Sequence, residues 1–271
     1  MYIRTIEDMH ICQIGLLSDF DRLCRDNGIK YFVFEGTLLG AVRHRDFVPW
    51  DDDMDVVLFR EDYNRLLALP ESKYPDHMKM YYPTADGTFL DFIPRIVDVR
   101  HEADPYPLTK HPFIDIFVLD GSYGGRKQKL RVTAQRLVYA MAMGHRGSRQ
   151  ILEHTISPEN AALRRMTRPL QCLGRLISLK KEAGWYASLS ERCTGTEMLY
   201  ISNMNPFLMH REYDASWFSG TVPMEIRGLT VPAPEGYDDI LRISYGDYTK
   251  LPPAGSRRPV HFKYDDDRGQ E

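Results

Sequence analysis

A run of acids that leads directly into an apolar segment is the feature that most constrains the fold. Residues 51–55 read Asp-Asp-Asp-Met-Asp, and Val-Val-Leu-Phe follows at 56–59. The apolar part predicts a strand over 51–59 that carries its acids at its start. Clustered carboxylates repel one another unless cations occupy them, so this run indicates a cation site.

Strand geometry sorts these acids onto two faces. Because alternate side chains point to opposite faces, Asp51, Asp53 and Asp55 are expected on one face, with Asp52 and Met54 on the other. Three carboxylates on one face form a typical site for a hard cation, Mg²⁺ or Mn²⁺. The alternative is a solvated acidic loop, but such a loop need not run directly into an apolar strand.

A second acid interrupts a later apolar strand. Asp115 lies between two isoleucines in the sequence Phe-Ile-Asp-Ile-Phe-Val-Leu at 113–119. A buried carboxylate is costly unless it is paired or bound to a metal. If a neighbouring strand brings Asp115 beside Asp53 and Asp55, these three are the metal ligands. The alternative is an edge strand with its acid in solvent.

A glycine-threonine turn precedes the acidic strand. Residues 35–40 read Glu-Gly-Thr-Leu-Leu-Gly and are expected to turn from a short strand into a short helix. Backbone amides at a helix start bind phosphate oxygens, so Gly36 and Thr37 are candidate phosphate-binding residues. Arg43, His44 and Arg45 follow and are candidates to contact phosphate as well. An ordinary turn followed by solvated cations is the alternative.

The remaining pattern predicts an α/β (α+β) fold, with a small mixed sheet flanked by helices and a helical basic segment. A soft boundary near residues 124–125 divides a catalytic core, 1–124, from a part, 125–271, that completes the same catalytic unit. In the helix expected at 126–142, one apolar side is formed by Leu130, Leu137, Val138 and Met141. The other helices are expected at 5–27, 62–69, 158–181 with a break near Pro169, 182–193 and 236–243, and the other strands at 29–34, 79–82, 92–99 and 229–231.

Charge is distributed unevenly along the chain. Residues 126–181 contain 13 lysines and arginines against two acids, a net charge of +11, and the other residues carry −14. Tyr139 is the one aromatic residue in this segment, whereas single-strand nucleic-acid binding uses several stacking platforms, so no nucleic-acid partner is expected. Two interpretations stay open: a solvated helical face, or peripheral contact with an anionic membrane. The late cations Arg257, Arg258 and His261 are expected on a solvated tail, with closure over phosphate as the alternative.

Several features favour a cytoplasmic protein. The apolar runs are far shorter than a membrane span, and the first residues lack the apolar stretch of a signal peptide. The four cysteines form no C-x-x-C pair and are expected to be reduced thiols. We therefore expect a cytoplasmic location, peripheral to the inner membrane face if the basic segment contacts lipid.

The order of these motifs resembles the DNA polymerase β-like nucleotidyltransferase superfamily, in which a Gly-Ser/Thr turn, a D-x-D pair and a third Asp follow one another. Within it, residues 35–44, EGTLLGAVRH, and 47–55, FVPWDDDMD, are similar to the signature of the LicD family. Residues 113–120 and the segment 245–253, with Tyr-Gly-Asp-Tyr and Leu-Pro-Pro, resemble the other two blocks of that family. The resemblance therefore covers most of the chain.

The resemblance implies a nucleotidyltransferase-like fold and a metal-dependent phosphotransferase. LicD-like proteins move phosphocholine or a related phospho-substituent from a CDP-activated donor to a sugar hydroxyl of a cell-surface glycan, such as a lipopolysaccharide. The implied partners are a CDP-linked donor, CDP-choline first, and a glycan or lipid-linked glycan acceptor. The implied roles are metal binding by Asp53, Asp55 and Asp115, proton removal by one of these or by Asp51, donor-phosphate binding by Gly36 and Thr37, and charge stabilisation by Arg43 and His44.

Two other functions are compatible with the same residues. One is a nucleotidyltransferase that makes an NDP-activated compound and releases pyrophosphate. The other is an inactive nucleotide- or glycan-binding module, against which the three candidate ligands Asp53, Asp55 and Asp115 argue. Among head groups phosphocholine leads, and phosphoethanolamine, aminoethylphosphonate and polyol phosphates remain open.

Overall fold

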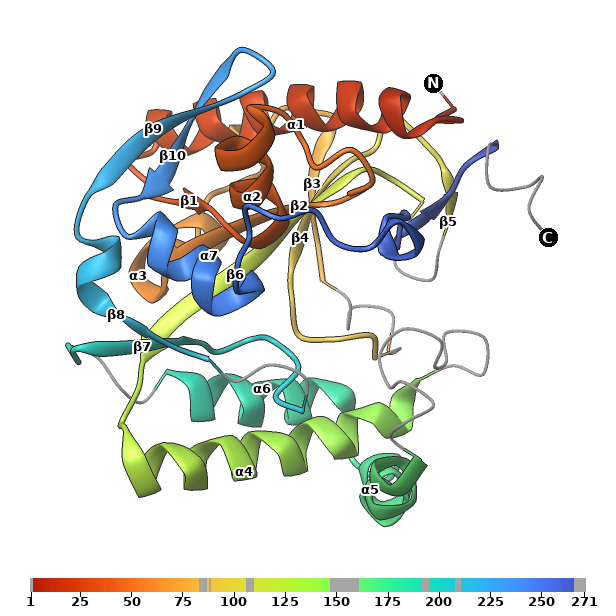
Figure 1. Ribbon diagram of the computed structural model, residues 1–271. Coiled ribbons are helices and arrows are strands. Elements are labelled where there is room, and N and C mark those ends of the chain that lie inside the picture. The colour runs from red at the N-terminus through yellow and green to blue at the C-terminus, as the bar shows by residue number, and fades with distance from the viewer. Residues whose placement is uncertain are drawn as a thin grey trace. The chain divides into compact units, whose positions relative to one another are not determined.

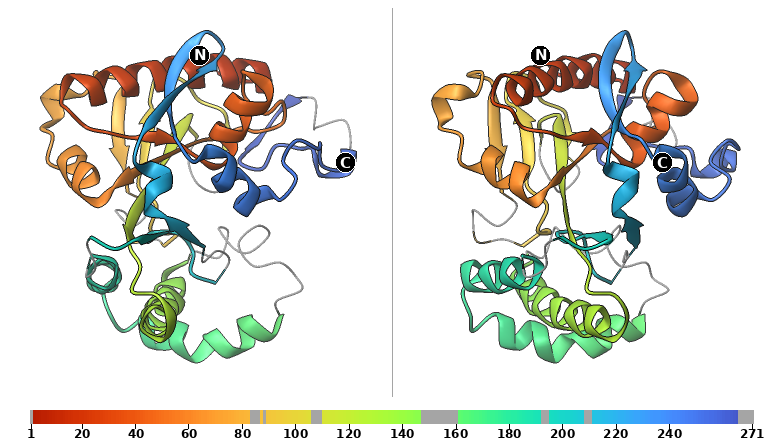
Figure 2. Two further views of the ribbon diagram at one scale, coloured as in Figure 1. Left: turned by 60° about the vertical axis from the view of Figure 1, so that its left-hand side comes forward. Right: turned by 90° about the vertical axis from the view of Figure 1, so that its left-hand side faces the viewer.

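A computed structural model describes residues 2–82, 87, 89–105, 110–146, 161–191, 195–207 and 211–265 (Figure 1). The fold is mixed α/β, which confirms the predicted class. The chain divides into two compact units. The first unit consists of Met1–Tyr81, Pro94–Leu119 and Tyr213–Glu271, and the second of Tyr82–Ile93 and Asp120–Glu212. In Figure 2 the first unit is mainly red to yellow and blue, and the second mainly green.

The first unit is built on a mixed sheet with the strand order β1-β2-β6-β4-β3. The central strands β2 and β6 are parallel, and the other neighbours in this order are antiparallel. All nine residues of β6 are buried, as expected for a central strand. The strands are β1 (Phe32–Val33), β2 (Met54–Phe59), β3 (Met78–Tyr81), β4 (Arg95–Asp98) and β6 (Phe113–Gly121).

Helix α1 (Ile6–Asp26) begins as the sequence predicts. The Thr5 hydroxyl accepts a hydrogen bond from the Asp8 amide, and the Asp8 carboxylate accepts one from the Thr5 amide, which together form a capping box. Its residues Met9 and Cys12 share a buried cluster with Phe113 of β6 and with residues near the C-terminus. The other elements of this unit are α2 (Glu35–His44), α3 (Arg60–Leu67), α7 (Tyr237–Tyr245), the hairpin β9 (Thr221–Ile226) and β10 (Leu229–Pro234), the pair β5 (Asp104–Pro105) and β11 (Phe262–Lys263), and 3₁₀ turns at Glu71–Lys73, Ala215–Phe218 and Ala254–Ser256.

Two elements around the acidic run differ from the expectation. Strand β2 begins at Met54 rather than at Asp51, because the backbone carbonyls of the first two acids are used by other groups: His10 and Gln13 of α1 contact the carbonyls of Asp51 and Asp52. Helix α2 begins at Glu35, so the expected turn is the first turn of the helix. An added Cβ at Gly40 would overlap the Asp46 carbonyl, so glycine lets α2 pack closely on the loop that leads to the acids.

The second unit contains α4 (Gly125–Ala142), α5 (Ala161–Gly174), α6 (Leu179–Ser190), β7 (Met198–Ile201) and a 3₁₀ turn at Met143–His145, and β8 (Glu212–Asp214) leads out of it. Helix α5 runs through Pro169, so the predicted break there is wrong. Proline removes one backbone donor, but Arg165 and Pro169 are both exposed, and water can satisfy the carbonyl that loses its partner. The chain turns instead between Gly174 and Leu179.

The apolar side expected for helix α4 is only partly buried. Leu130 and Leu137 are 73% and 48% exposed, so the expected packing face is wrong for these two residues, and Val138 and Met141 are only half-buried. The buried face carries Val132, Tyr139 and Ala140 together with the polar side chains of Arg131 and Gln135, whose hydrogen bonds are made inside the unit. Arg131 donates to the Gly121 carbonyl at 2.6 Å.

The buried polar side chains of α4 explain why these leucines face outward. The Arg131 guanidinium lies 4.5 Å from the ring centre of Tyr123 and 4.4 Å from that of Tyr200. Gln135 donates to the hydroxyls of Ser190 and Tyr200, each at 3.2 Å. Because these contacts satisfy buried polar groups, the helix can bury its polar side and leave leucines outside. Of the helices that the structure describes, none has the length and apolar character needed to cross a membrane.

Candidate active site

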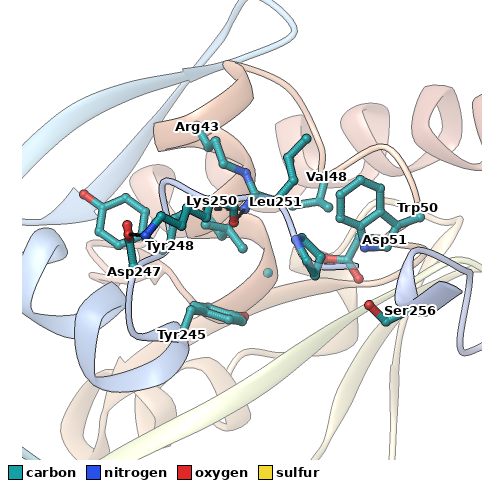
Figure 3. A pocket seen from close by; sticks show the side chains of 13 residues that line it. Arg43, Val48, Trp50, Asp51, Tyr245, Asp247, Tyr248, Lys250, Leu251 and Ser256 are labelled. Atoms are coloured by element: carbon teal, nitrogen blue, oxygen red, sulfur yellow. Dashed lines mark hydrogen bonds and ion pairs between the residues drawn. The ribbon is translucent and has the colours of Figure 1, made fainter. Parts of the chain in front are cut away.

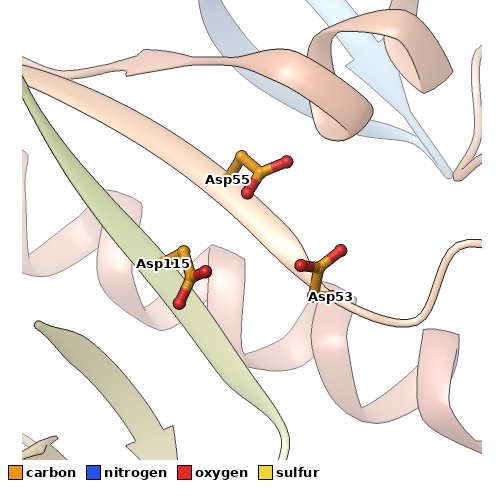
Figure 4. Close-up of side chains that lie close together, drawn as sticks. All are labelled: Asp53, Asp55 and Asp115. Atoms are coloured by element: carbon orange, nitrogen blue, oxygen red, sulfur yellow. The ribbon is translucent and has the colours of Figure 1, made fainter. Parts of the chain in front are cut away.

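Three carboxylates meet on the central strands of the first unit. The parallel register of β2 and β6 pairs Asp55 with Asp115, and Asp53 lies just before β2 (Figure 4). One oxygen from each of Asp53, Asp55 and Asp115 lies within 4.8 Å of the others. This arrangement confirms the predicted proximity. An all-carboxylate set of which two members are buried fits a hard divalent cation such as Mg²⁺ or Mn²⁺.

Arg95 holds one of these carboxylates from the neighbouring strand. The antiparallel register of β4 and β6 places Arg95 opposite Asp115, and the Arg95 Nε lies 2.6 Å from Asp115 Oδ1. The guanidinium carbon also lies 5.3 Å from the ring centre of Phe113. Both partners of this ion pair are buried, so the pair fixes the orientation of Asp115 and offsets part of the local negative charge.

The predicted phosphate-binding turn lies against Asp55. The Gly36 amide donates to Asp55 Oδ2 at 3.1 Å, and the Asp55 amide donates to the Thr37 hydroxyl at 2.8 Å. An added Cβ at Gly36 would overlap the Asp51 carboxylate, so Asp51 also lies at this turn. The positive N-terminal end of α2 therefore faces the acids. The phosphate contacts of Gly36 and Thr37 stay predictions.

A cavity of about 540 Å³ adjoins this cluster through Gly36 and Asp51 (Figure 3). Arg43 and Trp50 line it, together with Tyr245 at the end of α7 and Tyr248 just after that helix. The Arg43 guanidinium donates to the Tyr248 carbonyl at 3.1 Å and lies 6.0 Å from the Trp50 ring centre. The cavity thus combines a cation, aromatic rings and an edge of carboxylates.

His44 contributes differently from Arg43. Its Nε2 lies 2.9 Å from Arg43 Nε, which donates to it. Burial lowers the pKa of the His44 imidazole, and the Arg43 charge lowers it further. We therefore expect Arg43, rather than His44, to supply positive charge at neutral pH.

Comparisons with known proteins agree with this geometry. Residues 28–158 match the LicD/FKTN/FKRP nucleotidyltransferase domain. The matched stretch of this chain includes Asp53, Asp55 and Asp115. The chain is 27% identical to the lipopolysaccharide cholinephosphotransferase LicD of Haemophilus influenzae, over 96% of this chain and 97% of that protein. These two matches show that the chain is similar to the LicD family.

Two further relatives match over shorter stretches. An uncharacterised protein of Rickettsia typhi is 49% identical over 42% of this chain and 43% of its own length. The ribitol 5-phosphate transferase FKRP of Homo sapiens is 49% identical over 35 residues, 13% of this chain and 7% of that protein. The resemblance seen in the sequence motifs is therefore confirmed.

Burial and mutual repulsion set the protonation of the carboxylate cluster. Burial raises the pKa of Asp55 well above its usual range, and the charges of Asp53 and Asp115 raise it further. Burial also raises the pKa of Asp51 well above its usual range, again with help from the Asp53 charge. Without a cation the cluster therefore retains protons, and a bound dication would favour their release.

Asp52, on the opposite side of the acidic run, ties the C-terminal segment to the cluster. Its fully buried carboxylate accepts hydrogen bonds from the amides of Val260, His261 and Phe262, at 3.1, 3.0 and 2.8 Å. The alternation in the sequence predicts the face of Asp52. It gives no signal of these partners, which lie 208 to 210 residues further along the chain.

His261 lies between two of the acids. Its Nδ1 is 3.1 Å from Asp52 Oδ1, and its Nε2 is 3.4 Å from Asp53 Oδ2. Burial lowers the pKa of the His261 imidazole, but the charges of Asp53 and Asp52 and the Asp52 hydrogen bond outweigh it and raise the pKa to about 10. His261 is therefore a cation at neutral pH. The expectation of a solvated tail is wrong for this residue.

Glu35 and Tyr245 lie within the sequence motifs but were given no role there, and both border the site. Glu35, buried at the start of α2, has a left-handed φ of 37° and accepts a hydrogen bond from the Ser244 hydroxyl at 3.2 Å. A non-glycine residue in this region is strained by about 1–3 kcal/mol. Burial raises the pKa of the Tyr245 hydroxyl, as do the charges of Glu35 and Asp55. Helix α7 thus borders the acidic cluster.

Replacing the Asp52 anchor should destabilise the fold. In Asp52→Asn the side chain no longer offers two charged acceptors to the amides of Val260, His261 and Phe262, and we expect a loss of about 2–4 kcal/mol of unfolding free energy. Urea unfolding measures it. Glu61→Gln, which alters an exposed ion pair with Arg65 on α3, is the control and should cost less than about 1 kcal/mol. Equal unfolding of Asp52→Asn and the unaltered protein would contradict the anchor.

Cation binding should release protons. The raised pKa values of Asp51 and Asp55 mean that these carboxyls hold protons at pH values where free carboxyls are ionised, so Mg²⁺ or Mn²⁺ must displace them. We expect the cation affinity to fall as the pH falls. Isothermal titration calorimetry in two buffers of different ionisation enthalpy, at one pH, measures the protons released. A binding enthalpy that is independent of the buffer would contradict this protonation.

Proposed function

We propose that the protein is a metal-dependent phosphotransferase that moves phosphocholine, or a related phospho-substituent, from a CDP-activated donor to a sugar hydroxyl of a cell-surface glycan. The cluster of Asp53, Asp55 and Asp115 beside a cavity that contains Arg43 carries the proposal. The names of two relatives support it, because one transfers cholinephosphate and the other ribitol 5-phosphate. Both reactions move a phospho-substituent.

The geometry suggests how the residues share the work. Asp53, Asp55 and Asp115 would hold the cation, which when bound supplies charge neutralisation for the donor diphosphate. Arg43, whose Nη2 has no hydrogen-bond partner among the described residues, would contact the donor phosphates in the cavity. Gly36 would allow the backbone of α2 to approach them closely.

The reaction itself is a displacement at phosphorus. The acceptor oxygen forms a bond to the phosphorus that carries the head group, the bond from that phosphorus to the bridging oxygen breaks, and CMP leaves. The acceptor proton passes to a carboxylate. Asp51 is suited to this role, because it lies between the cluster and the cavity, although one of the other three acids could take the proton.

Two alternatives predict different products. A nucleotidyltransferase would join CTP to a phosphorylated compound and release pyrophosphate, whereas the proposed phosphotransferase releases CMP. A binding module would form neither product. One observation argues against the binding module. Buried carboxylates that repel one another are costly unless they bind a cation.

The proposed partners are a CDP-linked donor and a glycan or lipid-linked glycan acceptor, with no nucleic acid. Phosphocholine is the first head group to test, followed by phosphoethanolamine, aminoethylphosphonate and polyol phosphates. We propose a cytoplasmic location at the inner membrane face, and that the parts before and after residue 124 complete one catalytic unit.

Loss of one cluster carboxylate should abolish transfer. In Asp53→Asn we expect CMP release from CDP-choline to fall on the order of 10³-fold or more, because the charge stabilisation from the cation is lost. Chromatography of nucleotides, with Mg²⁺ and an acceptor glycan, measures the product for each CDP-linked donor. The exposed Asp26 provides a control, since Asp26→Asn should keep full activity.

The same assay separates the alternatives. Near-normal transfer by Asp53→Asn would show that the site is assigned wrongly. Pyrophosphate release from CTP with phosphocholine, in place of CMP release from CDP-choline, would favour the nucleotidyltransferase.

A further inference from the structure

The helices of the second unit expose large apolar side chains. Leu130 and Leu137 lie two turns apart on the outer side of α4, and Met166 and Leu173 are spaced in the same way on α5. Met166 is 75% exposed, and Leu176, just after α5, is 83% exposed. Contiguous apolar side chains on a surface mark interaction sites more often than single ones do.

The leucines of α4 are exposed although the buried polar side chains on the other side of the helix have hydrogen-bond partners. The opposite side of α4 buries Arg131 and Gln135 with hydrogen bonds inside the unit, so the helix is held with its leucines outward. Glycines let α5 pack closely on α4 and on the 3₁₀ turn that follows it, because an added Cβ at Gly174 would overlap the Met141 carbonyl and one at Gly144 the Gln171 carbonyl. Figures 1 and 2 show the two helices side by side at this contact.

The charged residues of the two helices themselves all have one sign. Neither α4 nor α5 contains an aspartate or a glutamate. Outward apolar residues among lysines and arginines are typical of a helix that lies in a membrane interface. The exposed cations on or just after the two helices are Arg126, Lys127, Lys129, Arg136, Arg165, Arg168 and Arg175.

We propose that α4 and α5 dock on an anionic lipid bilayer, with Leu130, Leu137, Met166, Leu173 and Leu176 entering the interface and the cations contacting lipid head groups. We call these five apolar residues and the seven cations the docking face. The positive charge selects an anionic surface, and the apolar residues add binding that salt does not screen. The biological setting rests on the proposed function, since a lipid-linked acceptor would lie at such a surface. The docking itself can be tested without any activity.

Co-sedimentation of the full chain with vesicles provides the test. We expect binding to vesicles of phosphatidylcholine with phosphatidylglycerol at low salt, weaker binding at high salt, and little binding to pure phosphatidylcholine. Leu130→Ser with Leu137→Ser should weaken binding about tenfold or more, and Lys127→Gln with Lys129→Gln should weaken it by a similar factor. Ile11→Ser on α1, where Ile11 is 54% exposed, is the matched control and should bind like the unaltered protein.

Three results would overturn the docking proposal: no binding at low salt, equal binding to neutral vesicles, or unchanged binding of the leucine variant. A dimer that light scattering detects, and that the leucine variant loses, would identify the face as a contact between copies instead. Transfer to a soluble acceptor should be unchanged in the leucine variant. Transfer without vesicle binding therefore refutes the docking alone, and vesicle binding without transfer from any CDP-linked donor refutes the proposed function alone.

Discussion

The arrangement of the first unit depends on how it offsets the repulsion between clustered carboxylates. Parallel pairing of β2 and β6 places Asp55 opposite Asp115, with Asp53 one step before β2. Each of these groups would be costly to bury alone. Positive groups converge on them from separate elements: Arg95 from β4, His261 from the C-terminal segment and the Gly36 amide from the start of α2. Charge is nevertheless only partly balanced, because the pKa of Asp55 stays well above its usual range. A divalent cation would complete the balance.

The local backbone follows from the same requirement. Gly36 leaves room for the Asp51 carboxylate, and Glu35 takes a strained left-handed conformation at the start of α2. Asp52 points the other way and binds the chain at 260–262, which brings His261 beside Asp53. Segments that are far apart in the sequence therefore contribute to one site, and the cavity beside Arg43 opens next to it. This convergence is what makes phosphoryl transfer the proposal that best fits the residues.

Sequence patterns predicted the parts of this arrangement that depend on local period. Alternation along the acidic strand separated Asp52 from Asp53 and Asp55, and the single acid in a buried strand indicated Asp115. The partners Arg95 and His261 could not be predicted, because strand register and the path of the C-terminal segment are set by long-range packing. The predicted apolar side of α4 is wrong for Leu130 and Leu137 for another reason. The hydrophobic period assumes an apolar interior, whereas here Arg131 and Gln135 satisfy their hydrogen bonds inside.

The central claim is that Asp53, Asp55 and Asp115 together hold a divalent cation. Anomalous diffraction at the manganese edge, from a crystal of the protein grown with Mn²⁺, locates that ion directly. The account expects a peak at about 2.0–2.6 Å from a carboxylate oxygen of each of the three aspartates. A manganese ion bound elsewhere in an otherwise intact first unit, with no peak among these three carboxylates, would contradict it.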